Sequence, residues 1–342
     1  MRSVDVHTHV LPKNVPRWSE RFGYGGFVRL VHEGEGGCKA RMVRDDGTQF
    51  REVESNCWDP AVRLRECDAA GVGVQVLSTV PVMLSYWIRE PRHALEVSRF
   101  LNDHIASLCA AQPRRFVGLG TLPMQAPDLA ARELHRCIDD LGLAGVEIGT
   151  HVGEWNLDRS ELFPVFAEAE DLGAALFVHP WDMMGQEQMP KYWLPWLVGM
   201  PAELSRAICT MIFGGVLERL PALRVCFAHG GGAFPITLGR IQHGFECRPE
   251  VVAADNPHPP TKYLGRFWVD SLVHDARALH YVIDTFGSHR VALGTDYPFP
   301  LGEERPGALV RSLDLDAKTR DGLLTRNALE WLSRDATELD LA

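Results

Sequence analysis

Lysine is scarce in this chain, and its scarcity disfavours one class of chemistry. An enzyme that forms a Schiff base needs a desolvated lysine as its nucleophile. Lys191 is the one lysine near a segment that we expect to border a site, MPKYWLPW, and it does not follow a strand. We therefore expect Lys191 to be solvated or to hold its loop in place. The whole set of lysines is Lys13, Lys39, Lys191, Lys262 and Lys318.

Further absences limit where the protein works and what it binds. The eight cysteines include no CxxC pair, unlike the dense framework of a small secreted domain, so they are expected to be reduced. No stretch approaches the roughly 20 apolar residues of a membrane span, and the N-terminus has no basic segment followed by an apolar core. The net charge, from 35 basic and 45 acidic residues, is −10, which disfavours nucleic acid or an anionic membrane as partner. These features predict a cytoplasmic protein with a small-molecule ligand.

Two common enzyme motifs are also missing. The nucleophile elbow GxSxG does not occur, although HGGG at 229–232 resembles the oxyanion loop of lipases. The first apolar strand is not followed by the glycine fingerprint of dinucleotide-binding sheets. A serine hydrolase and a doubly wound open sheet are therefore disfavoured.

The chain does contain a repeated alternation of short apolar runs and amphipathic segments. Near-continuous apolar runs suit parallel strands that are buried on both faces. These runs lie within the first ten residues and at 71–81, 115–123, 144–150, 174–180, 223–230, 266–273 and 290–298. Apolar residues at three- and four-residue spacing predict helices at 93–112, 127–141, 161–172, 202–219, 275–286 and 316–333.

Eight alternating units predict an α/β fold, a (β/α)8 barrel of the TIM type. We expect residues 1–342 to form a single domain, with a small β insertion after the first strand at about 12–57. Within it, Asp46-Gly47 lies between two extended runs, which is a hairpin signal. A second irregular segment, at 181–201, is rich in Trp and Met, and loops of this length are usually lids or interfaces.

Side chains that can bind metal follow the strands of this barrel. His7 and His9 are two residues apart, so in a strand both point to the same side. His179, His229 and Asp296 follow the fifth, sixth and eighth strands. Active sites of such barrels lie at the carboxyl ends of the strands, so all five are expected at one face. One histidine after a strand is usually structural, but five such residues in register predict a site.

The chemistry that these residue types suggest is that of a zinc enzyme. Zinc takes imidazole and carboxylate ligands, and a catalytic zinc usually keeps one position for a water whose pKa it lowers to near 7. The spacing leaves open whether His229 is a ligand or a general base, since an imidazole titrates close to neutral pH. Three other histidines near predicted strand or loop ends are expected to be structural or to lie at the rim: His151, His243 and His274.

The order of these residues along the chain resembles the amidohydrolase superfamily, which has HxH on strand one, His on strands five and six, and Asp on strand eight. In its binuclear members a lysine on strand four, usually carboxylated, bridges two metals. Here that strand reads AGVEIGT and has no lysine, so a single metal is expected. Two interpretations stay open for Glu147 of this strand: a replacement for the bridging lysine, or a polar residue of the core or barrel interior.

Longer motifs extend from His7 to about Glu303, through loops as well as strands: RFGYGG, CWDP, STVPVM, RRFVGLGTLPMQAP, HPWDM, KYWLPWLVGMPAE, CFAHGGGAFP and LGTDYPFPLGE. They resemble one family of this superfamily, the 2-amino-3-carboxymuconate-6-semialdehyde decarboxylases of tryptophan and nitrobenzoate catabolism. One departure is that the family can carry Lys just ahead of the Asp-Gly turn, where this chain has Asp45 after Arg44.

The resemblance implies a role for each matching residue. His229 would be the catalytic histidine, and Trp196 the Trp of the substrate loop. The carboxylates of the substrate would be bound by Arg51 and, from the neighbouring protomer of a homodimer, by Arg248. One zinc ion per chain would leave a position for water and would be held by His7, His9, His179 and Asp296.

The implied activity is zinc-dependent, nonoxidative decarboxylation of 2-amino-3-carboxymuconate 6-semialdehyde to 2-aminomuconate 6-semialdehyde and CO2. The conjugated chain of this substrate can accept the electrons, so no pyridoxal phosphate is required. The alternatives are a metal-dependent hydrolase or lactonase with the same centre, and a metal-binding regulatory barrel without turnover. An intact His229 argues against the last, because a site kept only for binding does not require a base.

Overall fold

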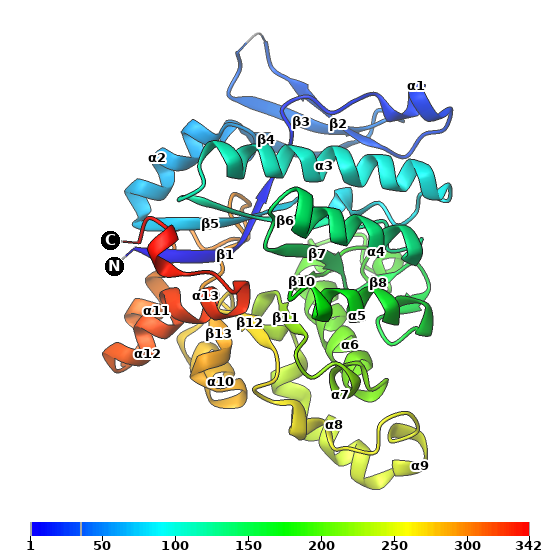
Figure 1. Ribbon diagram of the computed structural model, residues 1–342, viewed down its shortest axis with the longest axis vertical. Coiled ribbons are helices and arrows are strands. Elements are labelled where there is room, and N and C mark those ends of the chain that lie inside the picture. Colours follow the sequence, from blue (N-terminus) through cyan, green and yellow to red (C-terminus); the bar gives the residue numbers. More distant parts are fainter. Residues whose placement is uncertain (1, 35, 342) are drawn as a thin grey trace.

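The barrel strands follow one another around the sheet in chain order. A computed structural model describes residues 2–34 and 36–341 and shows eight parallel strands alternating with helices (Figure 1). The strands are β1 (Ser3–Val10), β5 (Val72–Thr79), β6 (Phe116–Thr121), β7 (Gly145–Gly149), β10 (Ala175–His179), β11 (Arg224–Phe227), β12 (Trp268–Asp270) and β13 (Val291–Ala292). Each lies inside one of the predicted apolar runs, so the (β/α)8 prediction is confirmed. Among the described residues, no helix has the length and apolar character needed to span a membrane.

The barrel closes between β1 and the segment that follows β13. The backbone N–H of Asp296 donates to His7 O at 2.9 Å, and that of His9 donates to Tyr297 O at 2.8 Å. These bonds continue the parallel pairing beyond the short strand β13. They place Asp296, from near the end of the chain, beside the two histidines of the first strand.

Helices cover the outside of the barrel. They are α2 (Pro60–Ala70), α3 (Pro91–Ala111), α4 (Pro127–His135), α5 (Phe163–Asp171), α6 (Met200–Phe213), α7 (Val216–Arg219), α8 (Phe234–Cys247), α9 (Pro249–Val252), α10 (Ala276–Phe286), α11 (Ala308–Ser312), α12 (Ala317–Asp321) and α13 (Asn327–Leu332). All six predicted helical segments are found. Three of them contain a break or a π-helical turn: 127–141 ends in a π-helical turn after α4, 202–219 divides at Gly214-Gly215 into α6 and α7, and 316–333 contains a π-helical turn between α12 and α13.

The apolar pattern predicts neither α2 nor α8. α2 has no apolar stripe, because its buried residues are Arg63 and Cys67. Its signal is instead at its start, where Asp59 accepts a hydrogen bond from the Ala61 N–H at 2.8 Å and Pro60 takes the first helical position. α8 contains two glycines and is largely exposed, so both its helix propensity and its apolar periodicity are weak.

The insertion after β1 is a small antiparallel sheet, as predicted. It contains α1 (Trp18–Phe22), β2 (Val28–His32), β3 (Lys39–Arg44) and β4 (Gln49–Glu54), and it lies beside α3, outside the barrel (Figure 1). The expected turn joins β3 to β4, and Gly47 there has a φ of +86°, which favours glycine. A second apolar core fixes the insertion to the barrel, and it includes Trp18, Phe27, Met42, Val97 and Leu101. A ribbon of β8 (His151–Val152) and β9 (Trp155–Asn156) follows β7.

Candidate active site

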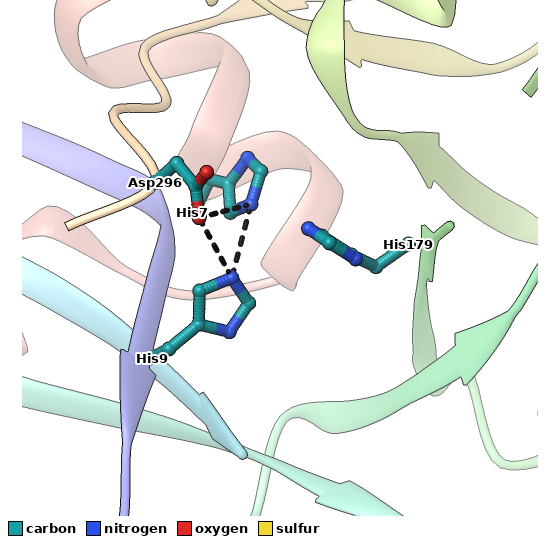
Figure 2. Close-up of side chains that lie close together, drawn as sticks. All are labelled: His7, His9, His179 and Asp296. Carbon is teal, nitrogen blue, oxygen red and sulfur yellow. Dashed lines mark hydrogen bonds and ion pairs between the residues drawn. The ribbon is translucent and has the colours of Figure 1, made fainter. Parts of the chain in front are cut away.

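The four residues predicted to bind metal meet at the carboxyl end of the barrel. His7 and His9 project from β1, with their Nε2 atoms 3.2 Å apart. Asp296 Oδ1 is 3.1 Å from His9 Nε2 and 3.5 Å from His7 Nε2. His179, the last residue of β10, lies across from them, and its ring centroid is 5.0 Å from each of the other two rings (Figure 2). One donor atom of each residue lies within 4.8 Å of the others. We call these four residues the metal cluster.

The metal cluster fits a divalent ion such as zinc. Two ligand atoms of a tetrahedral zinc are about 3.4 Å apart when both bonds are about 2.1 Å long, close to the observed spacing around Asp296. His179 Nε2 is buried, and it has no hydrogen-bond partner in the part of the chain that the structure describes. A metal bond would provide that partner. Burial and the neighbouring imidazoles hold the pKa of His179 well below its usual value, so its ring is neutral and able to coordinate.

Asp296 supplies the negative charge of the metal cluster. Burial raises the pKa of this carboxyl, but the hydrogen bond with His9 and the charges of the histidines outweigh burial and hold the pKa below its usual range.

The backbone at two residues of the site is left-handed. The φ of Asp296 is +59°, and that of His229 is +51°. Left-handed residues other than glycine are uncommon and concentrate at functional sites.

His229 lies beside the metal cluster but is not part of it. It follows β11, and its ring centroid is 5.2 Å from that of His7 and 5.1 Å from that of His179. It is absent from the group of donor atoms that converge. Burial, reinforced by His7, lowers the pKa of His229 to about 4, so the ring is neutral at pH 7. The geometry places His229 beside the converging donors and not among them, and its role as a general base stays a prediction.

Arg51 reaches the same site from the insertion. It lies on β4, is partly buried, and lines a small cavity of about 20 Å³ together with His9, His179 and Asp296. Its guanidinium carbon lies 4.3 Å from the centre of the Phe299 ring. Burial lowers the pKa of Arg51, and no carboxylate of the described residues forms an ion pair with it. Its charge is available to an anionic ligand.

Trp196 lies between this small cavity and a larger one. It is in the π-helical turn Pro195–Gly199, just ahead of α6. The larger cavity has a volume of about 680 Å³ and is lined by Trp196, His229 and Asp296. Large apolar side chains are exposed at its edge: Leu197, Ile236 and Tyr281. A space large enough for a small organic substrate therefore adjoins the metal cluster.

Arg248 does not belong to the site of its own chain. It follows α8, at the lower end of the molecule in Figure 1, and its exposed side chain pairs with Glu250. It lines neither of the cavities that Trp196 borders. Its contribution to a neighbouring protomer stays a prediction.

Glu147 faces the barrel interior beside His9. It is fully buried on β7, and its Oε1 is 3.7 Å from His9 Nδ1. Within residues 2–34 and 36–341, neither of its carboxyl oxygens has a hydrogen-bond partner. Burial raises the pKa of Glu147 to about 8, so the group is mostly protonated at pH 7. It is not among the converging donors. Of the two interpretations that the sequence left open, the structure shows the interior position.

Two buried charged residues that the sequence patterns do not reveal support the site. Asp270 ends β12 and accepts a hydrogen bond from His7 Nδ1 at 2.7 Å. Arg63 of α2 donates to the carbonyl oxygen of His9 at 2.9 Å. Asp270 has a detectable signal, because it ends an apolar strand just as His179 does. Arg63 has none, because nothing in its surroundings distinguishes it from the many surface arginines.

The other residues considered from the sequence lie away from the metal cluster. Lys191 is exposed, and Asp45 accepts a hydrogen bond from the Phe27 backbone N–H at 2.9 Å. Neither lines the cavity that contains Arg51. Of the three other histidines, His151 is bonded to backbone carbonyls and His243 is exposed, whereas His274 is exposed where it lines the larger cavity, the position of a rim residue.

Known proteins share both the sequence and the fold of this chain. The amidohydrolase family profile matches residues 4–334. A 2-amino-3-carboxymuconate-6-semialdehyde decarboxylase from Dictyostelium discoideum is 56% identical over 333 residues, which cover 97% of this chain and 92% of that protein. A protein of the same name from Caenorhabditis elegans is 42% identical over 385 residues, with coverages of 98% and 95%.

A solved structure agrees in fold. The 5-carboxyvanillate decarboxylase from Novosphingobium aromaticivorans, crystallised with manganese, matches with a TM-score of 0.74 and 24% identity over 82% of each chain. At that identity the match shows the shared barrel alone. The sequence matches are far stronger, and they confirm the resemblance seen in the motifs. This chain therefore belongs to the amidohydrolase family, where it is similar over nearly its whole length to 2-amino-3-carboxymuconate-6-semialdehyde decarboxylases.

Proposed function

We propose that the protein is a metal-dependent decarboxylase that converts 2-amino-3-carboxymuconate 6-semialdehyde to 2-aminomuconate 6-semialdehyde and CO2. The observation that carries this proposal is Arg51, an arginine without an acidic partner among the described residues, in the same cavity as the metal cluster. Guanidinium groups pair with carboxylates in planar, charge-assisted geometry. A site for an uncharged ester would not require this buried charge.

The proposed metal is zinc, one ion per chain, held by the metal cluster. Three imidazoles and one carboxylate are donors that zinc accepts. When bound there, the ion would polarise a substrate oxygen and lower the pKa of water. Strand β7 offers no lysine to bridge a second ion. Manganese, present in the solved relative, is the competing assignment, and elemental analysis of the purified protein distinguishes the two.

The proposed substrate contacts combine residues of two protomers. Arg51 would bind one carboxylate in its own chain, and Arg248 of the neighbouring protomer of a homodimer would bind the other. Trp196 would form a wall that excludes water from the cavity. The exposed apolar side chains at the cavity edge support a second chain at this place, because patches of this kind often mark interfaces.

The proposed chemistry moves one proton and breaks one carbon–carbon bond. His229, neutral at pH 7, would act as the general base and remove a proton from water. The bond to the departing carboxylate then breaks, and its electron pair stays on the substrate and spreads through the conjugated aldehyde. The resulting imidazolium of His229 would return this proton to the carbon that lost CO2, and the hydroxide left behind would take up a proton from solvent, so that the net reaction consumes one proton. No electron leaves the substrate, so no redox cofactor is required.

The decisive experiment is anaerobic incubation of the purified protein with the amino-carboxymuconate semialdehyde. We expect its absorbance to decay while an equal amount of CO2 is released. Decay without CO2 would instead support the alternative hydrolase or lactonase. Protein stripped of metal by a chelator is the control, and it should show neither change.

The proposed setting is the cytoplasm, with residues 1–342 as a single domain. All eight cysteines are free, as expected for a reducing compartment. Cell fractionation with an antibody tests the location, and a single cooperative unfolding transition would support one domain.

A further inference from the structure

The three histidines of the metal cluster are oriented by different oxygen atoms. His9 Nδ1 lies 2.8 Å from the carbonyl oxygen of Thr79. His179 Nδ1 lies 3.0 Å from the carbonyl oxygen of Pro180, its own neighbour in the chain. Backbone carbonyls are present whatever the side chains are. The Ser78 hydroxyl also lies 3.2 Å from His9 Nδ1, but each of these two rings has a backbone carbonyl as its shortest Nδ1 contact, which the fold itself supplies.

His7 is oriented by a side chain instead. Its Nδ1 lies 2.7 Å from Asp270 Oδ2, and both residues are fully buried. A carboxylate accepts hydrogen bonds but does not donate, so Nδ1 carries the proton. The lone pair of His7 is then on Nε2, the atom that faces His9 and Asp296.

The second oxygen of Asp270 holds the loop that carries His229. Asp270 Oδ1 accepts hydrogen bonds from the backbone N–H of Gly230 at 2.8 Å and from that of Leu272 at 3.0 Å. Gly230 directly follows His229. One buried carboxylate thus fixes the ring of a metal-cluster residue and the backbone next to the proposed base.

Two glycines near Asp270 stand where a side chain would clash with its neighbours. A Cβ atom at Gly294 would lie 2.7 Å from the Cβ of Asp270 and 2.9 Å from that of His7. A Cβ at Gly230 would lie 2.4 Å from a methyl group of Val273. Glycine at these two positions allows the close approach of the three segments that Asp270 joins.

We infer that Asp270 is a positioning residue, which aims His7 Nε2 into the metal cluster and sets the place of His229 through Gly230. This inference rests on the proposed metal-binding role of His7. Carboxylates that orient a metal-bound histidine typically change metal affinity or activity by about 10–100-fold when they are mutated. Asp270 would act on the metal and on the base together.

The test is Asp270→Asn, which keeps the size of the side chain but removes one acceptor. If the amide nitrogen faces His7, Nδ1 of the ring must accept a hydrogen bond from it. The ring proton then moves to Nε2, the atom that would coordinate the metal. If the amide nitrogen faces Gly230, two donors oppose each other and the loop of His229 must shift. Neither orientation restores both contacts.

Two readouts separate a positioning role from a merely structural one. Zinc affinity, measured by competition with a chelator, should fall about 10–100-fold. At saturating zinc, kcat should still fall, with little change in KM, because His229 is displaced. Unchanged zinc affinity would show that Asp270 does not orient His7. An unchanged kcat at saturating zinc would show that Asp270 does not set the position of His229.

Glu133→Gln is the matched control. Glu133 is as buried as Asp270, and it accepts hydrogen bonds from Asn102 and Arg99 on the outer side of the barrel. The zinc affinity of the Glu133→Gln variant should equal that of the wild type, even if the variant is less stable to unfolding. CO2 release by the wild type is measured in parallel, so a wrong reaction assignment would be seen separately from a wrong role for Asp270.

A measurement on the wild type covers the case in which Asp270→Asn does not fold. Nitrogen-15 spectra of the imidazoles in metal-free protein should show His7 protonated at Nδ1, with a proton shifted strongly downfield by the short bond to Asp270. A proton on Nε2 of His7 would contradict the inference without any variant.

Discussion

The metal cluster comes from one part of the fold, and the proposed substrate contacts of the same chain, Arg51 and Trp196, come from others. We call these two residues the substrate wall. His7, His9 and His179 lie on barrel strands and are at most 2% exposed. Arg51 comes from the β insertion and Trp196 from the segment ahead of α6, and both are only partly buried. Strand ends are fixed by hydrogen bonds to neighbouring strands, whereas loops and insertions vary more easily. We therefore expect the barrel to determine the metal chemistry, and its additions to determine which substrate reaches it.

The two regions also differ in how complete they are within one chain. The metal cluster has all its donor atoms within 4.8 Å of one another. The proposed substrate wall has Arg51, which forms no ion pair within residues 2–34 and 36–341, while Arg248 is remote and exposed. A substrate with two carboxylates would need a second cation, which is why the proposal brings Arg248 from a partner. A substitution in the metal cluster should thus affect only the site of its own chain. A substitution of Arg248 should affect the site of the partner chain.

The largest effect is expected from His179→Ala. Removal of one of four donors should abolish tight zinc binding, and turnover should fall to that of metal-free protein. Elemental analysis and CO2 release measure the two effects. His243→Ala, a change of an exposed histidine on α8, should keep both. Two tightly held metals per chain, or zinc undiminished in His179→Ala, would contradict the mononuclear site.

His229→Ala should separate metal binding from proton transfer. We expect the variant to keep its zinc but to lose at least the roughly 100-fold in kcat that a general base contributes. The reason is geometric, since the ring lies near His7 and His179 but outside the converging donors. A variant that purifies without metal would make His229 a ligand, and the proposed chemistry would be wrong.

Mixed dimers test whether the substrate contacts are shared between protomers. Arg51→Ala and Arg248→Ala homodimers should each be nearly inactive, because every site lacks one arginine. After subunit exchange, half of the dimers should be mixed, and one of their two sites should have both arginines. Activity should then recover to roughly a quarter of the wild type.

The controls for this mixing experiment come from the same helix. Arg240→Ala changes an exposed arginine of α8 and should be active without mixing. Exchange itself is followed by mass or by tags. A mixture that exchanges subunits but stays at the level of its parents would place both arginines in one chain, or show that neither is needed.

The sequence predicts the metal cluster well because the signal is local. Buried parallel strands leave near-continuous apolar runs, and the residues at their ends, such as His179 and Asp296, stand out against them. The barrel then brings these ends together without any further information. Asp270 carries the same local signal, because it ends the apolar strand β12.

The positions of Arg51 and Arg63 could not be predicted from the sequence, because they depend on packing between segments far apart in the chain. Arg51 reaches the site only because the insertion folds back on the barrel through its second apolar core. Arg63 is buried in a helix that has no apolar stripe, and its role comes from one bond to the carbonyl of His9. Neither contact leaves a pattern in the neighbouring residues. The roles of Arg51, Trp196 and Arg248 therefore rest on family resemblance until they are tested.

The smallest effect is expected at the turn of the insertion, which lines neither cavity of the site. Gly47 has a φ of +86° and open space around its Cα, so Gly47→Ala adds backbone strain without a clash. A left-handed alanine costs about 1–2 kcal/mol, and urea unfolding should show a loss of about that size. In Gly239→Ala, the control in the exposed helix α8, alanine should instead stabilise by about 0.5–1 kcal/mol. Zinc content should be unchanged in both variants. A Gly47→Ala protein that loses zinc would show that the insertion and the metal cluster are coupled, contrary to the division drawn between them.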